Sequence, residues 1–158
     1  QFARWYVVAY SVQTITITLA SLADTAWRQS TARDNTSDGF LDAHVGGSIR
    51  VGTGPITNGG KINIFLYGSY DGTNYTAGAS GSDAAYTADG EQGLLLPLEQ
   101  IVVDSSTGAD YVFGPISAVE RFGMRALPEK WGVIVENTTG DSLDSTGGNH
   151  HIKFNGIT

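Results

Sequence analysis

Apolar and polar residues alternate over several short stretches of this chain, and the alternation predicts β-strands. The most regular stretch is residues 14–19, in which Ile15, Ile17 and Leu19 alternate with threonines. Successive side chains of a strand point to opposite faces, so this period of two predicts a strand with one buried face. The same period recurs in FLDAHVGGSIRV (40–51), KINIFLYGSY (61–70) and WGVIVEN (131–137). No long stretch has the helical period.

Turn residues separate these stretches. Gly46–Gly47 predicts a bulge or bend within the strand at 40–51, and Asp71–Gly72 predicts a hairpin turn. Pro97 restricts residues 94–98 to an edge strand or a strand start, because proline has no N–H for a β-ladder. About eight short strands with turns between them predict an all-β, single-domain protein, an antiparallel β-sandwich with a jelly-roll-like arrangement.

A length of 158 residues is typical of one domain with its own core. We interpret residues 25–158 as the β-sandwich domain and residues 1–24 as an N-terminal strand segment available for contact between subunits. Trp5, Tyr6 and Tyr10 are the candidate interface residues, since aromatic side chains are enriched in interface cores. The alternative is that these three side chains fill the core of their own protomer.

Charge and cysteine content narrow the classes of partner. Charged residues make up 16% of the chain, below the roughly 25% typical of soluble domains. The formal net charge of −7 argues against nucleic acid and anionic membranes as partners. Cysteine is absent, which excludes disulfides and thiolate chemistry and favours assembly in a reducing cytoplasm. No apolar run approaches the roughly 20 residues of a membrane span.

Candidate catalytic and metal-binding residues are few. The sequence has no G-x-S-x-G motif, and His44, beside Asp42 in a predicted strand, is interpreted as a sheet-surface residue. His150 and His151 are adjacent, so in a strand they point to opposite faces and are poorly placed to bind one metal ion. We therefore expect no catalytic residues, no metal site, no cofactor and no enzymatic activity.

DNTSDG (34–39) has the oxygen spacing of the first half of a calcium-binding loop, but Val45 stands where the bidentate glutamate belongs. A turn with hydrogen bonds from side chains to the backbone is the better interpretation of this stretch. Tyr70 and Tyr75 flank the turn DGTN and are candidates for a sugar-stacking platform. Trp131 alternates with Val133 and Val135, which places its side chain in the core.

Five stretches carry longer and more distinctive strings. They are AWRQSTARDN (26–35), FLDAHV (40–45), INIFLYGSYDGTNY (62–75), SGSDAAYT (80–87) and LPEKWGVIVENTTGDSLDSTGGNHHIKFNG (127–156). Together they resemble a family of small structural proteins from the virions of tailed bacteriophages. The resemblance covers most of the chain from Ala26 onward, and none of its motifs is catalytic.

The resemblance implies a virion structural protein, either a capsid decoration (cement) protein or a tail-associated one. A decoration protein would bind the major capsid protein on the outer capsid surface and stabilise the shell. The resemblance also implies a homo-oligomer, with a trimer expected, that assembles in the host cytoplasm and resides on the capsid exterior of the virion. The alternative functions are a tail-associated protein and a carbohydrate-binding β-sandwich module.

Overall fold

The computed structural model describes residues 10–158, so the candidate interface residues Trp5 and Tyr6 lie outside the described residues. The strands are β1 (Tyr10–Thr14), β2 (Trp27–Gln29), β3 (Arg33–Asp34), β4 (Asp42–Arg50), β5 (Lys61–Ser69), β6 (Ala84–Ala85), β7 (Leu96–Val102), β8 (Asp110–Ser117), β9 (Lys130–Thr138) and β10 (His151–Ile157). The helices are α1 (Asn35–Asp38) and α2 (Ala118–Phe122), with 3₁₀ turns η1 (Thr76–Gly78), η2 (Gln92–Leu94) and η3 (Gly147–Asn149). Within residues 10–158, no helix has the length and apolar character needed to cross a membrane.

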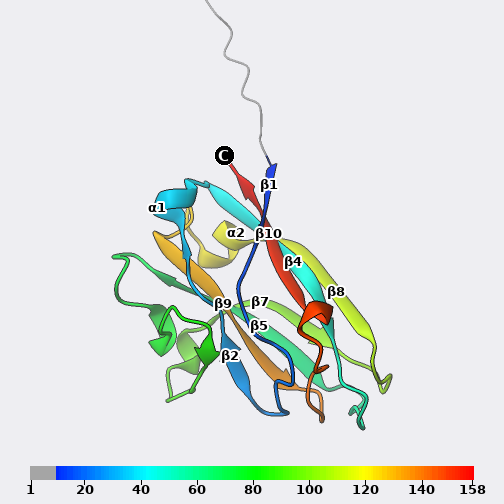
Figure 1. Ribbon diagram of the computed structural model, residues 1–158. Helices are drawn as coiled ribbons and strands as arrows, with labels where there is room; N and C mark the ends of the chain where they lie inside the picture. The colour runs from blue at the N-terminus through cyan, green and yellow to red at the C-terminus, as the bar shows by residue number, and fades with distance from the viewer. Residues whose placement is uncertain (1–9) are drawn as a thin grey trace, which may run out of the picture.

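The strands form two antiparallel sheets that pack face to face (Figure 1). Sheet A has the order β1-β10-β4-β8, and sheet B has the order β6-β2-β9-β5-β7, with β3 also paired to β9. Apart from the two short strands β3 and β6, the chain visits the sheets in the sequence A, B, A, B, B, A, B, A. This order is the double Greek key of a jelly roll. The predicted all-β sandwich with a jelly-roll arrangement is confirmed.

The core lies between the two sheets and is centred on Trp131. The Trp131 side chain is fully buried, and Val133 and Val135 follow it into the same cluster. The ring of Phe154 from sheet A meets the Trp131 ring edge-on, with 5.1 Å between the ring centroids. The interpretation of Trp131 as a core residue is confirmed.

A second apolar cluster covers the outer face of sheet B. Tyr67 and Ile134 point outward from this sheet, and the long connection between β5 and β7 packs on them through Ala77, Tyr86 and Leu95. The hydroxyl of Tyr67 donates to the carbonyl of Ser30 at 2.6 Å, so its buried polar atom is paired. Sheet B is therefore covered on both of its faces.

The described part of the predicted N-terminal segment is built into the sandwich. Strand β1 pairs along its length with β10, from Tyr10 opposite Ile157 to Thr14 opposite Lys153. Tyr10 is 68% exposed, so this residue does not fill the core of its own protomer. Its place in an interface between subunits stays a prediction.

The most regular alternation, in residues 14–19, does not form a strand beyond Thr14. Ile15 and Leu19 are buried as the pattern predicts. The segment, however, crosses from sheet A toward sheet B, so its hydrogen-bond partners change along its length. The N–H of Ile15 donates to β10, whereas the N–H of Thr18 donates to the carboxylate of Asp83 at 3.1 Å. The period of two identified the extended backbone and its buried face, but the predicted β-ladder was wrong.

The predicted hairpin at Asp71–Gly72 is also wrong, although the turn itself forms. The Asp71 carboxylate accepts hydrogen bonds from the N–H groups of Thr73 and Asn74, at 2.9 and 2.8 Å. No hairpin follows, because β7 and β9 already occupy both edges of β5. The edge-strand prediction at Pro97 is confirmed, since β7 is an outermost strand of sheet B.

Acid should destabilise the fold through carboxylates that accept hydrogen bonds. Hydrogen bonds from Asn74 and Thr73 hold the pKa of Asp71 well below its usual range. Hydrogen bonds shift several other aspartate pKa values in the same direction, namely those of Asp34, Asp83, Asp104, Asp110 and Asp144. A carboxylate whose pKa is lower in the folded state contributes stability above its unfolded-state pKa, and this contribution is lost as the pH falls toward the folded-state pKa.

We therefore expect the free energy of unfolding in urea to decrease as the pH falls below about 4. The expected difference between the wild type and Asp71→Asn is largest near neutral pH and shrinks in acid. Chemical denaturation of both proteins from pH 7 to pH 2.5 measures this dependence. A stability that is flat over that range would contradict the prediction.

Candidate functional site

Strand β1, at the edge of sheet A, has its polarity reversed. Val12 points outward with Tyr10 and is 67% exposed, whereas the polar residues Ser11 and Gln13 are half-buried on the inner side. An edge strand of an antiparallel sheet normally turns its apolar side chains toward the core. Hydrogen bonds satisfy the polar side chains on the inner side of β1. The Gln13 side chain donates to the Ser11 hydroxyl at 2.9 Å and accepts from Arg33 at 3.4 Å. The reversal adds apolar side chains to the outer face of sheet A.

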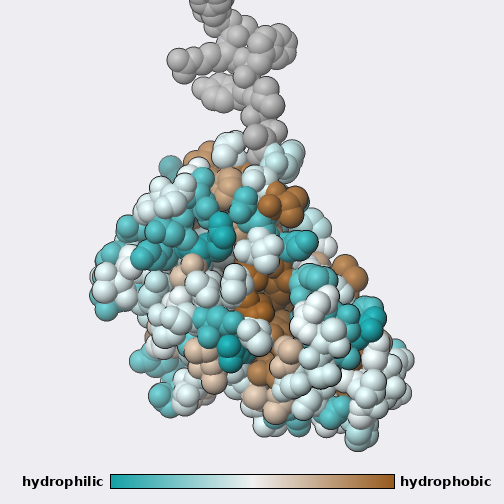
Figure 2. Space-filling model, in the orientation of Figure 1, coloured by the Kyte–Doolittle hydropathy of each residue, from teal (hydrophilic) through white to brown (hydrophobic). Residues whose placement is uncertain are grey.

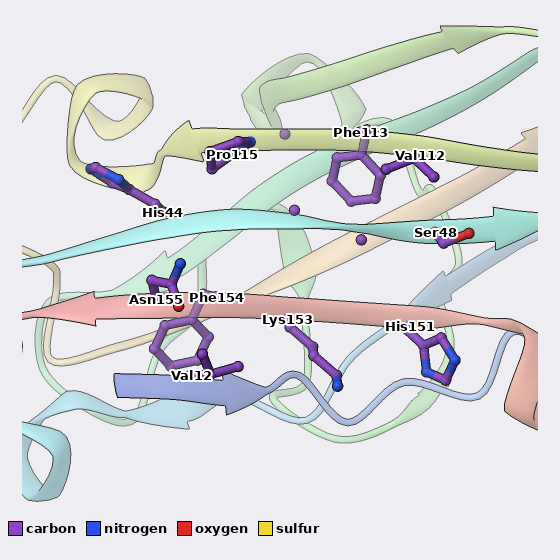
Figure 3. A pocket seen from close by; sticks show the side chains of 13 residues that line it. Val12, His44, Ser48, Val112, Phe113, Pro115, His151, Lys153, Phe154 and Asn155 are labelled. Atoms are coloured by element: carbon purple, nitrogen blue, oxygen red, sulfur yellow. The ribbon is translucent and has the colours of Figure 1, made fainter. Parts of the chain in front are cut away.

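A groove crosses this outer face along one cross-strand row. In that row Thr14 pairs with Lys153 and Lys153 pairs with Gly46, beside Gly114 of β8. The rows on either side form the walls, with Val12, Asn155 and His44 on one side and His151, Ser48 and Val112 on the other. The groove has a volume of about 520 Å³. Figure 3 shows side chains from β1, β4, β8 and β10 around its glycine floor.

The floor consists of glycines because the backbones there are too close for a side chain. A Cβ on Gly47 would lie 1.9 Å from the carbonyl oxygen of His151, and one on Gly114, which has a φ of 81°, would lie 2.3 Å from that of Val45. The β4–β8 register shifts between Val45 and Gly47. The irregularity predicted at Gly46–Gly47 is present, but the extra residue lies on β8 opposite Gly46, so the bulge is in β8 and not in the strand at 40–51.

The groove combines apolar walls with basic and neutral polar groups. Val112 is 80% exposed on one wall, and Val12 lies on the other. Lys153, His44 and His151 line the groove, and none of the described residues that line it carries a carboxylate. The groove therefore differs in charge from the chain as a whole, which has a net charge of −7.

The other exposed large apolar side chains of residues 10–158 lie on different elements. They are Leu41, Tyr70, Leu94, Val102 and Met124. They are spread over the connections next to β4, β5 and β7, the end of β7, and the turn after α2. Figure 2 shows hydrophobic residues in a strip between hydrophilic flanks on the side of the molecule that it presents.

His44 lies next to Asp42 and Ser117, but the three residues are not arranged as in a serine hydrolase. The Ser117 hydroxyl donates to the Asp42 carboxylate at 2.7 Å and accepts from the N–H of Glu120 at 3.1 Å, as the N-cap of α2. His44 Nε2 lies 3.3 Å from the same carboxylate oxygen. In a hydrolase the imidazole lies between the serine and the carboxylate, whereas here the carboxylate lies between the other two. The arrangement caps a helix and provides no base for Ser117.

The adjacent histidines are separated as expected. His150 Nε2 lies 2.8 Å from the carbonyl of Asp144, and its Nδ1 accepts from the N–H of Arg50 at 3.4 Å, so this ring holds the last loop in place. His151 is exposed at the groove. Across residues 10–158, no three His, Cys, Asp or Glu side chains come together as ligands for a metal ion.

The two tyrosines of the predicted sugar platform lie in different surroundings. Tyr70 is 85% exposed at the end of β5. The Tyr75 ring meets Tyr67 edge-on, with 5.7 Å between centroids, and it also lies against Gly81. Of the two rings, Tyr70 is therefore the freer one for stacking against a ligand.

The fold and surface define a jelly roll whose two outer faces differ. The connection between β5 and β7 covers the outer face of sheet B, whereas the outer face of sheet A, called the bare face below, carries no such cover among the described residues. No protein-family model matches the chain, and a search of curated proteins finds no match. The bare face, which carries the groove and the reversed edge strand, is the candidate functional site. In the sequence, this site is indicated by the alternation of YSVQT in β1. In the structure, Tyr10 and Val12 of this stretch are the exposed positions.

Proposed function

We propose that this protein is a non-enzymatic structural protein of a bacteriophage virion. The proposed role is that of a capsid decoration (cement) protein, which binds the major capsid protein on the outer surface and stabilises the shell. Two lines of evidence support this role: the resemblance of residues 26–156 to phage virion proteins, and the jelly-roll fold. Jelly rolls occur in viral capsid domains and in lectins, so the fold alone is an argument by analogy.

The observation that carries the proposal is the bare outer face of sheet A. Tyr10, Val12 and Val112 are exposed there, while the equivalent face of sheet B is covered by its own connection. A monomeric protein rarely leaves apolar residues grouped on one face, and such patches mark sites of protein–protein contact. The low charge of the chain also suits a protein that packs against neighbouring subunits.

A decoration protein would stabilise the shell because many copies of it bind to many copies of the same capsid site. A capsid repeats the same site many times, and an oligomeric decoration protein, here proposed as a trimer, engages several sites together. Linked contacts raise the overall affinity by orders of magnitude without any single contact being strong. The mechanism needs complementary surfaces and no chemical step.

Co-sedimentation with expanded capsids of the parent phage that lack the protein tests this proposal. The wild type should bind saturably, at a stoichiometric copy number. Val112→Glu places a charge on the bare face and should weaken binding by about tenfold or more, because the charge loses solvation in the contact. The matched control is Val102→Glu, at an exposed valine on β7 of sheet B, and it should bind like the wild type. A wild type that does not bind, or equal binding by the two variants, would count against the proposal.

A carbohydrate-binding module, free-standing or in a phage tail, is the second candidate. The exposed ring of Tyr70 favours it, because the neighbouring Asp71 fixes the turn through hydrogen bonds to the backbone. Saturable binding on a glycan array that Tyr70→Ala abolishes would support this function. A low copy number together with a tail location in intact virions would support the tail-associated alternative.

A further inference from the structure

We propose that the groove on the outer face of sheet A binds the N-terminal segment, residues 1–9, of a second copy of this chain. The inference deepens the proposed function and rests on it in one respect, the assignment of this face as a protein contact. It assigns the groove on this face to a second subunit, while the rest of the face stays the proposed contact with the major capsid protein.

Sheet A ends at the row of paired residues that contains Tyr10. Tyr10 pairs with Ile157, and Ile157 pairs with Asp42, the first residue of β4. Among the described residues, no strand of sheet A continues past this row. The described strands of sheet A therefore offer no pairing partner beyond Tyr10. An apolar segment attached at this end of β1 is expected to bury its side chains against another surface.

The composition of the segment fits a buried location. Residues 1–9 read QFARWYVVA, and every residue except Gln1 and Arg4 is apolar or aromatic. Trp5 and Tyr6 supply the large, rigid side chains that dominate contact energies in protein interfaces. Nine residues in a fully extended conformation would span about 30 Å.

The groove has the size and chemistry to receive this segment. Its walls carry Val12 and Val112, and its glycine floor lets another backbone or ring approach closely. Lys153 lines the groove and makes no ion pair with any described residue. An ammonium group in this position can interact with the face of an aromatic ring such as that of Trp5.

The geometry also determines the kind of assembly. The segment leaves one subunit at the edge strand β1, and the groove lies on the sheet face, so the two surfaces in contact are different. Contacts between unlike surfaces close into a ring when the rotation between subunits allows it, and reciprocal exchange gives a pair. Either closed assembly presents several copies together, as multivalent attachment requires.

Disulfide trapping tests the contact directly, because residues 1–158 contain no cysteine. Tyr6→Cys and Val112→Cys are purified separately, one of them with a mass tag, then mixed and oxidised. Non-reducing electrophoresis should show the mixed disulfide in yields several times higher than with Val102→Cys in place of Val112→Cys. Val102 is a suitable control because it is also an exposed valine, but on sheet B. Equal yields from the two positions would overturn the inference.

Oligomeric state provides a second measurement. The full chain should be oligomeric by light scattering after gel filtration. Removal of residues 1–9 should give a monomer with an unchanged far-ultraviolet spectrum, and so should Val112→Glu in the full chain. A full chain that is monomeric, or a truncated chain that stays oligomeric, would contradict the proposal.

Capsid binding separates failure of this inference from failure of the proposed function. Wild-type protein that binds capsids saturably but forms no trapped disulfide would refute the inference and leave the proposed function standing. Trapping of Val112→Cys only to the major capsid protein would do the same and would identify that protein as the occupant. An oligomer that is trapped through the groove but does not bind capsids would support the inference and refute the decoration role.

Discussion

Trp131→Ala is expected to lower the free energy of unfolding by about 3–5 kcal/mol, the typical cost of removing a buried tryptophan. The side chain has no exposed surface and lies between the sheets, against the ring of Phe154. Its removal takes away apolar contacts and leaves a cavity that the strands cannot close, because hydrogen bonds to β3 and β5 hold β9 in place. Trp131→Phe should cost less, since a ring remains between the sheets.

Urea unfolding followed by far-ultraviolet circular dichroism measures this effect without relying on the fluorescence of the residue that is removed. Tyr70→Ala is the matched control, because it removes an exposed aromatic ring at the end of the adjacent strand. It should change the free energy of unfolding by no more than about 0.5 kcal/mol. A Trp131→Ala variant as stable as this control would show that the two sheets do not pack around that ring.

Gly47→Ala is the second substitution with a large expected effect, a loss of about 3 kcal/mol or more. The added Cβ would lie 1.9 Å from the carbonyl oxygen of His151 and 3.1 Å from the Cα of Ile152. Both are backbone atoms of β10, so relief of the clash requires the β4–β10 pairing to move apart. At positions without a clash, a glycine-to-alanine change often stabilises a protein by restricting the unfolded chain. A decrease in the free energy of unfolding for Gly47→Ala would therefore indicate the backbone clash.

Gly148→Ala provides the control for this prediction. No atom lies within 4 Å of a Cβ at Gly148, and its φ is outside the left-handed region. Parallel urea titrations should therefore show a small change for Gly148→Ala and a large loss for Gly47→Ala. Equal midpoints for the two variants would mean that β4 and β10 do not approach as closely as described.

The strands whose burial follows a local pattern were predicted well. FLDAHVGGSIRV contains β4 in full, and KINIFLY and WGVIVEN contain most of β5 and β9. Apart from the exposed Leu41, the apolar residues of these stretches are buried or half-buried as expected. Local turn chemistry was equally informative at DNTSDG, where Asp34 accepts a hydrogen bond from the N–H of Thr36 and caps α1. In these cases, residues close together in the chain decide the structure.

The errors came from features that depend on distant residues. The alternation at 14–19 predicted a β-ladder, but this segment crosses between the sheets. The backbone N–H and the hydroxyl of Thr18 donate hydrogen bonds to the carboxylate of Asp83 instead of to a neighbouring strand. The turn at Asp71 could not form a hairpin, because β7 and β9 compete for the edges of β5. Neither the path between the sheets nor the competition for an edge is visible in a short window of sequence.

The candidate site shows the same division. The aromatic N-terminal segment was visible as a candidate interface from the sequence, and the described structure adds the exposed Tyr10 of β1 to the bare face. The groove was not visible, although the pairs Gly46–Gly47 and Gly114–Pro115 marked the two places where its floor lies. Those pairs are separated by more than sixty positions in the chain, and only the register of β4 with β8 brings them together.

The sequence by itself determined which segments are extended, which of their faces are apolar, and where the chain turns, because these properties depend on consecutive side chains. The tertiary structure decided which strands are neighbours, and therefore which face is covered and which is bare. Those outcomes depend on pairing between distant strands, since a groove exists only where small residues from several strands fall in one row. Gly46 of β4 and Gly114 of β8, whose backbones lie side by side, form such a row.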